Sequence, residues 1–183
     1  MTADPKDELV THLGAMRAFA MSLTRNAALA DDIVQDALVK AWSNIGSFQP
    51  GTNMRAWLFT ILRNTYYSHH RKRKREVEDT EGEMSAGLAQ KPDHDGRLQM
   101  RDFNTAFGEL PEEQREALVL VGAGGFSYEE AAETCGVAVG TIKSRVNRGR
   151  ARLIALMDIS EDDTLEVTDA VTQGIVTMNQ SIA

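Results

Sequence analysis

Residues 127–153 carry the pattern that most limits what this chain can form. Ser127 precedes Tyr-Glu-Glu, a polar residue followed by acids, which is the usual start of a helix. Gly136 is placed to end that helix, and Gly140 to begin another. Two short helices joined by a tight glycine turn predict a helix-turn-helix.

The second of these helices has two contrasting faces on a helical wheel. Its apolar stripe, the predicted core side, consists of Ile142, Val146, Gly149 and Leu153. From Val137 to Leu153 the segment holds five cations and no acid, whereas a merely solvated helix face usually mixes both signs. Amide and hydroxyl groups suit base edges, and cations suit phosphates, so the outward side predicts a DNA-binding surface. Its predicted DNA contacts are Lys143, Ser144, Asn147 and Arg148 on the outward side and Arg145 on the flank, where Arg150 and Arg152 also lie.

Segment 30–45, ADDIVQDALVKAWSNI, predicts an amphipathic helix. Its apolar residues share one broad face, which we expect to be buried. The pattern alone leaves two interpretations of the opposite face open, a plain solvent-exposed surface or a protein contact. An exposed valine among acids indicates a contact. The residues concerned are Asp32, Gln35, Asp36 and Val39.

Segment 54–75 predicts a longer helix that runs into five consecutive cations, RKRKR. We expect Met54, Leu58, Ile61, Leu62 and Thr65 to be buried. The expected exposed side carries Phe59, Thr60, Arg63 and Tyr67, with Asn64 at its border. Exposed aromatics interleaved with cations suit unstacked bases, and the preceding loop SFQPGTN suits a flipped base. The alternative is that the aromatics are core and the basic run is a solvated terminus.

Charge is unevenly distributed along the 183 residues, whose formal net charge is -7. Residues 1–75 carry +5, whereas segments 76–99 and 158–183 carry -5 and -6. Segment 76–99 is polar and broken by glycine and proline, so it predicts a flexible acidic linker. We therefore expect an all-α chain of two small helical domains, 8–75 and 100–157, the second containing the helix-turn-helix, followed by an acidic tail, 158–183.

Several classes of protein are disfavoured by the sequence. The amino terminus is acidic and polar, no apolar stretch is long enough to cross a bilayer, and the single cysteine, Cys135, cannot form an internal disulfide. These features predict a cytoplasmic protein without a membrane partner. The chain lacks a phosphate loop, metal-ligand spacing and the arrangements of nucleophilic catalysis, so we expect neither an enzyme nor a cofactor.

Three motifs together resemble one family. DDIVQDALVKAW is similar to the second conserved region of group 4 (extracytoplasmic-function, ECF) sigma factors, and FQPGTNMRAWLFTILRNTYY to their promoter-melting region. ELPEEQREALVLVGAGGFSYEEAAETCGVAVGTIKSRVNRGRARL resembles their fourth region. The amino-acid sequence around the helix-turn-helix is especially similar to that of the alphaproteobacterial general stress (EcfG-type) sigma factors.

The resemblance implies a promoter-specificity subunit of RNA polymerase and assigns roles to the surfaces above. The acidic face, Asp32, Gln35, Asp36 and Val39, would contact the β′ clamp helices of core polymerase, and the fourth region would contact the β flap. The helix-turn-helix set would read the minus-35 element of promoter DNA. The implied partner that holds the protein inactive is a small NepR-like anti-sigma factor. The residues that would open and hold the minus-10 element are Asn53, Arg55, Phe59, Arg63, Asn64 and Tyr67.

Two other functions compete with this interpretation. One is a sigma-like decoy that captures an anti-sigma factor without binding DNA. Such a decoy has no need of Lys143, Arg145 and Arg148, and it is joined to a receiver domain for which this chain has no room. The other is a helix-turn-helix repressor that dimerises through its first domain, which leaves the face from Phe59 to Tyr67 unexplained.

Overall fold

Helices are the only regular elements in residues 5–79 and 95–157, the parts of the chain that the computed structural model describes. This confirms the all-α prediction within those ranges. The chain divides into two units, Met1–Ala89 and Gln90–Ala183. The middle of the predicted linker and the predicted acidic tail, 158–183, lie outside the described residues.

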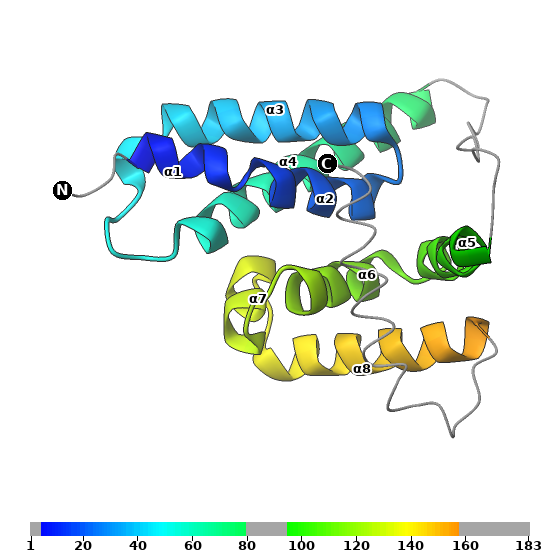
Figure 1. The fold of residues 1–183 in the computed structure, drawn as a ribbon. Helices are drawn as coiled ribbons and strands as arrows, with labels where there is room; N and C mark the ends of the chain where they lie inside the picture. Colours follow the sequence, from blue (N-terminus) through cyan, green and yellow to red (C-terminus); the bar gives the residue numbers. More distant parts are fainter. Residues whose placement is uncertain (1–4, 80–94, 158–183) are drawn as a thin grey trace. The chain divides into compact units, whose positions relative to one another are not determined.

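Within residues 5–79, the first unit consists of the helices labelled α1, α2, α3 and α4 in Figure 1 and a short 3-10 turn, η1. Helix α3 packs against both α2 and α4. Asn26 caps α3 by accepting a hydrogen bond from the Leu29 amide at 2.9 Å. Arg17 on α2 donates to Asp31 on α3 at 2.7 Å, and this hydrogen bond raises the pKa of the guanidinium. The elements are α1 (Pro5–Thr11), α2 (Leu13–Thr24), α3 (Ala27–Ser43), η1 (Ile45–Ser47) and α4 (Met54–Asp79).

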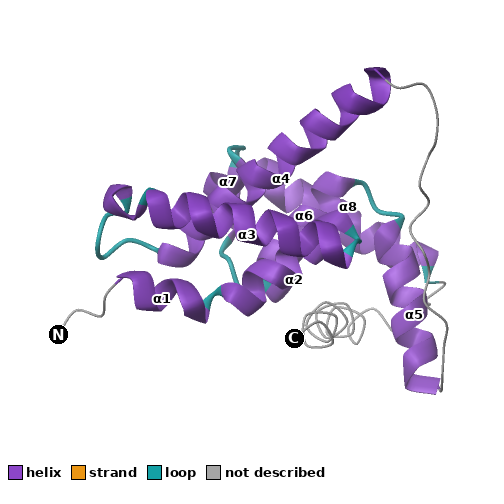
Figure 2. Cartoon of the chain, turned by 90° about the horizontal axis from the view of Figure 1, so that it is seen from above, coloured by secondary structure: helices purple, strands orange, loops and turns teal. Residues whose placement is uncertain are grey.

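Helix α4 is longer than the sequence pattern indicates. It continues to Asp79, and its carboxy-terminal end projects beyond α2 and α3 (Figure 2). Lys72 and Glu76, one turn apart, form an ion pair at 3.9 Å that favours this extension. The described part of the second unit begins with α5 at Asp95, so both ends of segment 76–99 are helical.

The expectation that Phe59 is exposed is wrong. Phe59 is 1% exposed, and its ring centroid lies 5.2 Å from that of Phe19 on α2. The predicted buried stripe is confirmed at Met54, Leu58, Leu62 and Thr65, whereas Ile61 is only half-buried. Because α4 packs against both α2 and α3, its buried face is wider than a single stripe of residues. Phe59 and Tyr66 lie on the additional part of this buried face.

The second unit contains the predicted helix-turn-helix. Its elements are α5 (Asp95–Gly108), α6 (Glu112–Leu118), a π-helical turn η2 (Val119–Ala123), α7 (Tyr128–Cys135) and α8 (Val139–Leu156). Ser127 and Glu130 form a reciprocal capping box at the start of α7. Gly136 ends α7 with φ 66°, a left-handed conformation that glycine adopts without strain.

The predicted core stripe of α8 is confirmed, because Ile142, Val146, Gly149 and Leu153 are all buried. Gly149 lies so close to α6 that a Cβ placed there would be 2.8 Å from Leu118 Cδ1. A larger residue at this position would require the Leu118 side chain to shift, so glycine suits this close approach of α6 and α8. The buried stripe fixes which side of α8 remains available for a partner.

Candidate nucleic-acid interface

The outward side of α8 carries most of the predicted minus-35 residues as expected. Lys143, Asn147 and Arg148 are exposed, and Ser144 is half-buried. The Lys143 Nζ lies 5.7 Å from the ring centroid of Tyr128, the first residue of α7. This side of the helix therefore presents two cations, an amide and a hydroxyl group, which are the groups that recognise base edges and phosphates.

Arg145 differs from the other predicted contacts of α8. Its side chain is only 17% exposed, and its Nη2 lies 3.2 Å from the Glu113 carboxylate of α6. A wheel drawn for α8 alone has no means of finding this partner, because Glu113 comes from another helix. In the structure Arg145 connects α6 to α8, and its charge is offset by an acid.

A polar hollow of about 350 Å³ lies beside the start of α8. It is bordered by the Glu113–Arg145 pair and by the exposed Arg148. The remaining lining residues are Gln114, Gly140, Thr141 and Ser144. The hollow makes the basic side of α8 concave at its amino-terminal end, the end of the recognition helix that contacts bases in helix-turn-helix proteins.

The predicted minus-10 residues all lie on or just before α4, but they occupy different environments. Asn53 is exposed and accepts a hydrogen bond from the Ala56 amide at 3.1 Å, so it also caps α4. Arg63 is half-buried with its guanidinium 4.6 Å from the ring centroid of Tyr67. The half-buried Arg55 lies 5.9 Å above the buried Phe59 ring. Asn64 is exposed.

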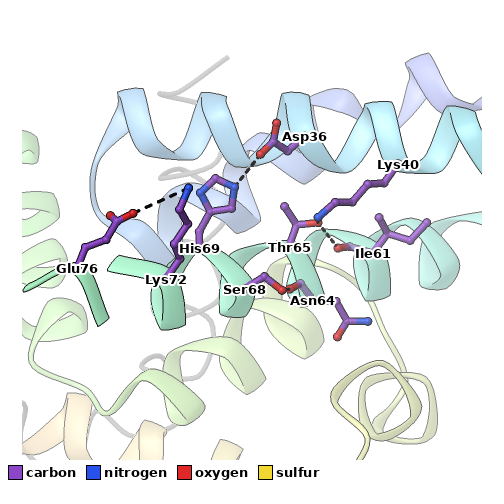
Figure 3. A network of polar contacts seen from close by, with 9 residues as sticks. All are labelled: Asp36, Lys40, Ile61, Asn64, Thr65, Ser68, His69, Lys72 and Glu76. Atoms are coloured by element: carbon purple, nitrogen blue, oxygen red, sulfur yellow. Dashed lines mark hydrogen bonds and ion pairs between the residues drawn. The ribbon is translucent and has the colours of Figure 1, made fainter. Parts of the chain in front are cut away.

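A second hollow of about 350 Å³ lies between α3 and α4. Lys40 crosses from α3 to donate to Thr65 Oγ1 at 3.1 Å, and that hydroxyl donates to the Ile61 carbonyl at 2.8 Å (Figure 3). Asn64 is the predicted site residue that lines this hollow. The other residues that line the hollow come from three separate segments, so no pattern within one segment predicts them as a group. They are Lys40, Asn44, Ser47, Trp57, Ile61, Thr65 and Ser68.

The acidic side of α3 is exposed as predicted. Asp32, Gln35, Asp36 and Val39 are all solvent-accessible, and Val39 is 66% exposed. Trp42, one turn further along, is 53% exposed and was not among the predicted residues. The Asp36 carboxylate lies 2.7 Å from His69 Nε2 on α4 (Figure 3). The face thus combines acids with two large apolar side chains, a composition suited to a protein partner.

Neither a spanning helix nor a metal-binding group is present in the described ranges. No helix there is both long and apolar enough to cross a membrane. The same residues contain no group of three or more His, Cys, Asp or Glu side chains placed to hold a metal ion.

Comparison with known proteins places both units in one family. The model of sigma-70 region 2 matches residues 9–76, and that of sigma-70 region 4 matches residues 100–153. The ECF RNA polymerase sigma factor EcfG of Rhodopseudomonas palustris (strain TIE-1) is 52% identical over 171 residues, which cover 90% of this chain and 94% of that protein. The chain belongs to the ECF sigma factors. These matches confirm the resemblance of the sequence motifs to this family. Sigma factors bind core RNA polymerase and promoter DNA.

Two solved structures extend the comparison of this sigma factor. The sigma factor RpoE of Bartonella quintana, solved in complex with the anti-sigma factor NepR, matches with a TM-score of 0.77 and 51% identity, covering 85% of this chain and 98% of that one. The PhyRSL–NepR complex from Sphingomonas sp. Fr1 matches with a TM-score of 0.63, over 86% of this chain and 92% of that one. At 18% identity, the second match shows only a shared fold.

Proposed function

We propose that this sigma factor directs core RNA polymerase to the promoters of general stress genes, works in the cytoplasm without enzymatic activity of its own, and is held inactive by a NepR-like anti-sigma factor. The observation that carries the proposal is the division of α8 into a fully buried stripe and an exposed basic and polar side. The stress role and the inhibitor rest on the similarity to EcfG and to the RpoE of the NepR complex.

The exposed side of α8 would read the minus-35 element in the major groove. Lys143 and Arg148 are exposed and would meet base edges or phosphates, and Asn147 lies between them along the helix. Ser144 adds a hydroxyl at the border of the same side. Arg145, a predicted DNA contact, would act indirectly, by holding α8 against α6 through its ion pair with Glu113.

The minus-10 element would be opened and held by the first unit. Arg63 stacked on Tyr67 offers a cation and an aromatic face to an unstacked strand. Asn53 and Arg55 lie at the start of α4, beside the loop that leads into it. The hollow between α3 and α4 has the size of a small-ligand site and is lined by Asn64 and Asn44, whose amides suit the edge of a flipped base. Phe59 would support this surface from beneath rather than stack on DNA.

Core polymerase would bind the acidic side of α3. Asp32, Gln35, Asp36 and Val39 would face the β′ clamp helices, and Trp42 extends the same surface. The second unit would contact the β flap. An interface of this kind joins apolar contact with charge complementarity, which gives it both affinity and orientation.

The decoy function is less consistent with these features. A decoy that never meets DNA has no use for the exposed Lys143 and Arg148 or for a hollow at the start of α8. The similarity to the PhyRSL complex is one of fold, whereas EcfG shares half of the residues.

Arg148→Ala should relax promoter selectivity at the minus-35 element and leave polymerase binding intact. A well-placed base contact gives about 1–3 kcal/mol of discrimination, so we expect roughly a 5- to 150-fold loss of preference at one base pair. The measurement is run-off transcription from promoters that differ at single minus-35 positions.

Arg152→Ala is the matched control, because Arg152 is also exposed on α8 but lies on the flank of the predicted reading side. It should weaken binding uniformly across sequences and lower the salt dependence by about one phosphate contact. Wild-type base preferences in Arg148→Ala would show that α8 does not read the minus-35 element through this residue.

A further inference from the structure

Tyr128 occupies a fixed position at the start of the helix-turn-helix. It directly follows Ser127, whose side chain accepts from the Glu130 amide at 3.1 Å while the Glu130 carboxylate accepts from the Ser127 amide at 2.8 Å. These two bonds hold the first turn of α7, from which the Tyr128 side chain extends. Its ring is half-buried, so part of it is available to a neighbouring side chain.

The neighbour is Lys143 on α8. The Lys143 ammonium lies 5.7 Å from the Tyr128 ring centroid, within the range of a cation–π interaction. Lysine has a flexible four-carbon chain, and ordering such a chain on binding costs affinity. A ring that extends from this capped turn limits where the ammonium can lie before DNA binds.

The contact of Lys143 differs in kind from that of Arg145. Glu113 offsets the charge of Arg145 at 3.2 Å and leaves that side chain largely buried. The Tyr128 ring carries no negative charge to pair with Lys143, and Lys143 is exposed. The first two cations of α8 therefore have different partners. Arg145 is paired with an acid of α6, whereas Lys143 lies over an aromatic ring of α7.

We propose that Tyr128 is a positioning residue for promoter recognition, which holds the Lys143 ammonium against its ring and thereby sharpens the base preference that Lys143 confers. This inference rests on the proposed minus-35 reading by α8. Tyr128 acts through Lys143 and not through a DNA contact of its own.

The test is a double-mutant cycle in holoenzyme assembled from core polymerase and the full chain. Promoters with every base at each minus-35 position are transcribed in competition, and Lys143→Met identifies the position whose preference depends on Lys143. Tyr128→Leu, which keeps apolar bulk but removes the ring, should reduce that preference about two- to fivefold, the effect of one exposed cation–π contact. Tyr128→Phe keeps the ring and should retain it.

The decisive comparison is Tyr128→Leu in the Lys143→Met background, where we expect no further change in base preference. An equal loss in both backgrounds would mean that Tyr128 supports the fold only and would overturn the proposal. An equal loss in Tyr128→Phe and Tyr128→Leu would assign the effect to the hydroxyl and would also overturn it. If the wild-type holoenzyme shows no minus-35 preference, the proposed function fails first; if it shows one and the cycle gives no coupling, only the role of Tyr128 fails.

Discussion

Phe59→Ala should destabilise the first unit by about 3–5 kcal/mol, because it empties a large volume from a well-packed core. Phe59 is 1% exposed and packs on Phe19 between α2 and α4. Loss of that size is comparable with the whole stability of many small domains. The chain's two tryptophans, Trp42 and Trp57, both lie in this unit, so their fluorescence during denaturation reports its unfolding separately from the second unit.

Tyr67→Ala is the matched control for Phe59→Ala. Tyr67 is an aromatic residue of the same helix but is only half-buried, with Arg63 over its ring. The Tyr67→Ala variant should retain most of the stability of the first unit and lose affinity for single-stranded minus-10 DNA. If Phe59→Ala keeps wild-type stability but loses minus-10 binding, Phe59 stacks on DNA bases and the structure is contradicted.

Asp36→Arg should weaken association with core polymerase about 30-fold or more. Disrupting one partner of a desolvated charge pair in an interface costs about 2–5 kcal/mol, and each 1.4 kcal/mol is a factor of ten. Asp36 is exposed on α3, so the substitution leaves the core of the unit untouched, although it removes the contact with His69. The dissociation constant is measured by titrating labelled chain with core polymerase.

Two controls separate an interface effect from a general one. His69→Ala removes the same Asp36–His69 contact without reversing charge on α3, and we expect it to retain most of the affinity. Glu8→Arg makes the same change of charge on α1, where the resemblance places no polymerase contact, and it should bind normally. Unchanged binding by Asp36→Arg, with helical circular dichroism preserved, would remove α3 from the polymerase interface.

The helix-turn-helix could be predicted from sequence because its signals are local. The polar N-cap followed by acids, the glycine at the turn and the apolar stripe of α8 all lie within one short segment, and the structure confirms each of them. The stripe on α8 is narrow, so the opposite side follows from it directly. The exposure of the acidic side of α3 followed from the same reasoning.

The errors and omissions come from contacts between separate segments. The prediction that Phe59 is exposed failed because α4 packs against two helices. A helical wheel with one buried stripe assigns the residues that face the second helix to the exposed side. The Glu113–Arg145 pair and the Lys40–Thr65 bond each join two helices far apart in sequence. No periodicity within one helix contains that information.

The central claim is that this chain gives core RNA polymerase its promoter specificity, and run-off transcription with purified core enzyme and a promoter pool randomised at both elements tests it directly. We expect transcripts that depend on the added chain and that derive from promoters sharing two separated elements. The contradicting result is a chain that still binds a NepR-like anti-sigma factor but yields no more transcript than core enzyme alone. That result would favour the decoy function.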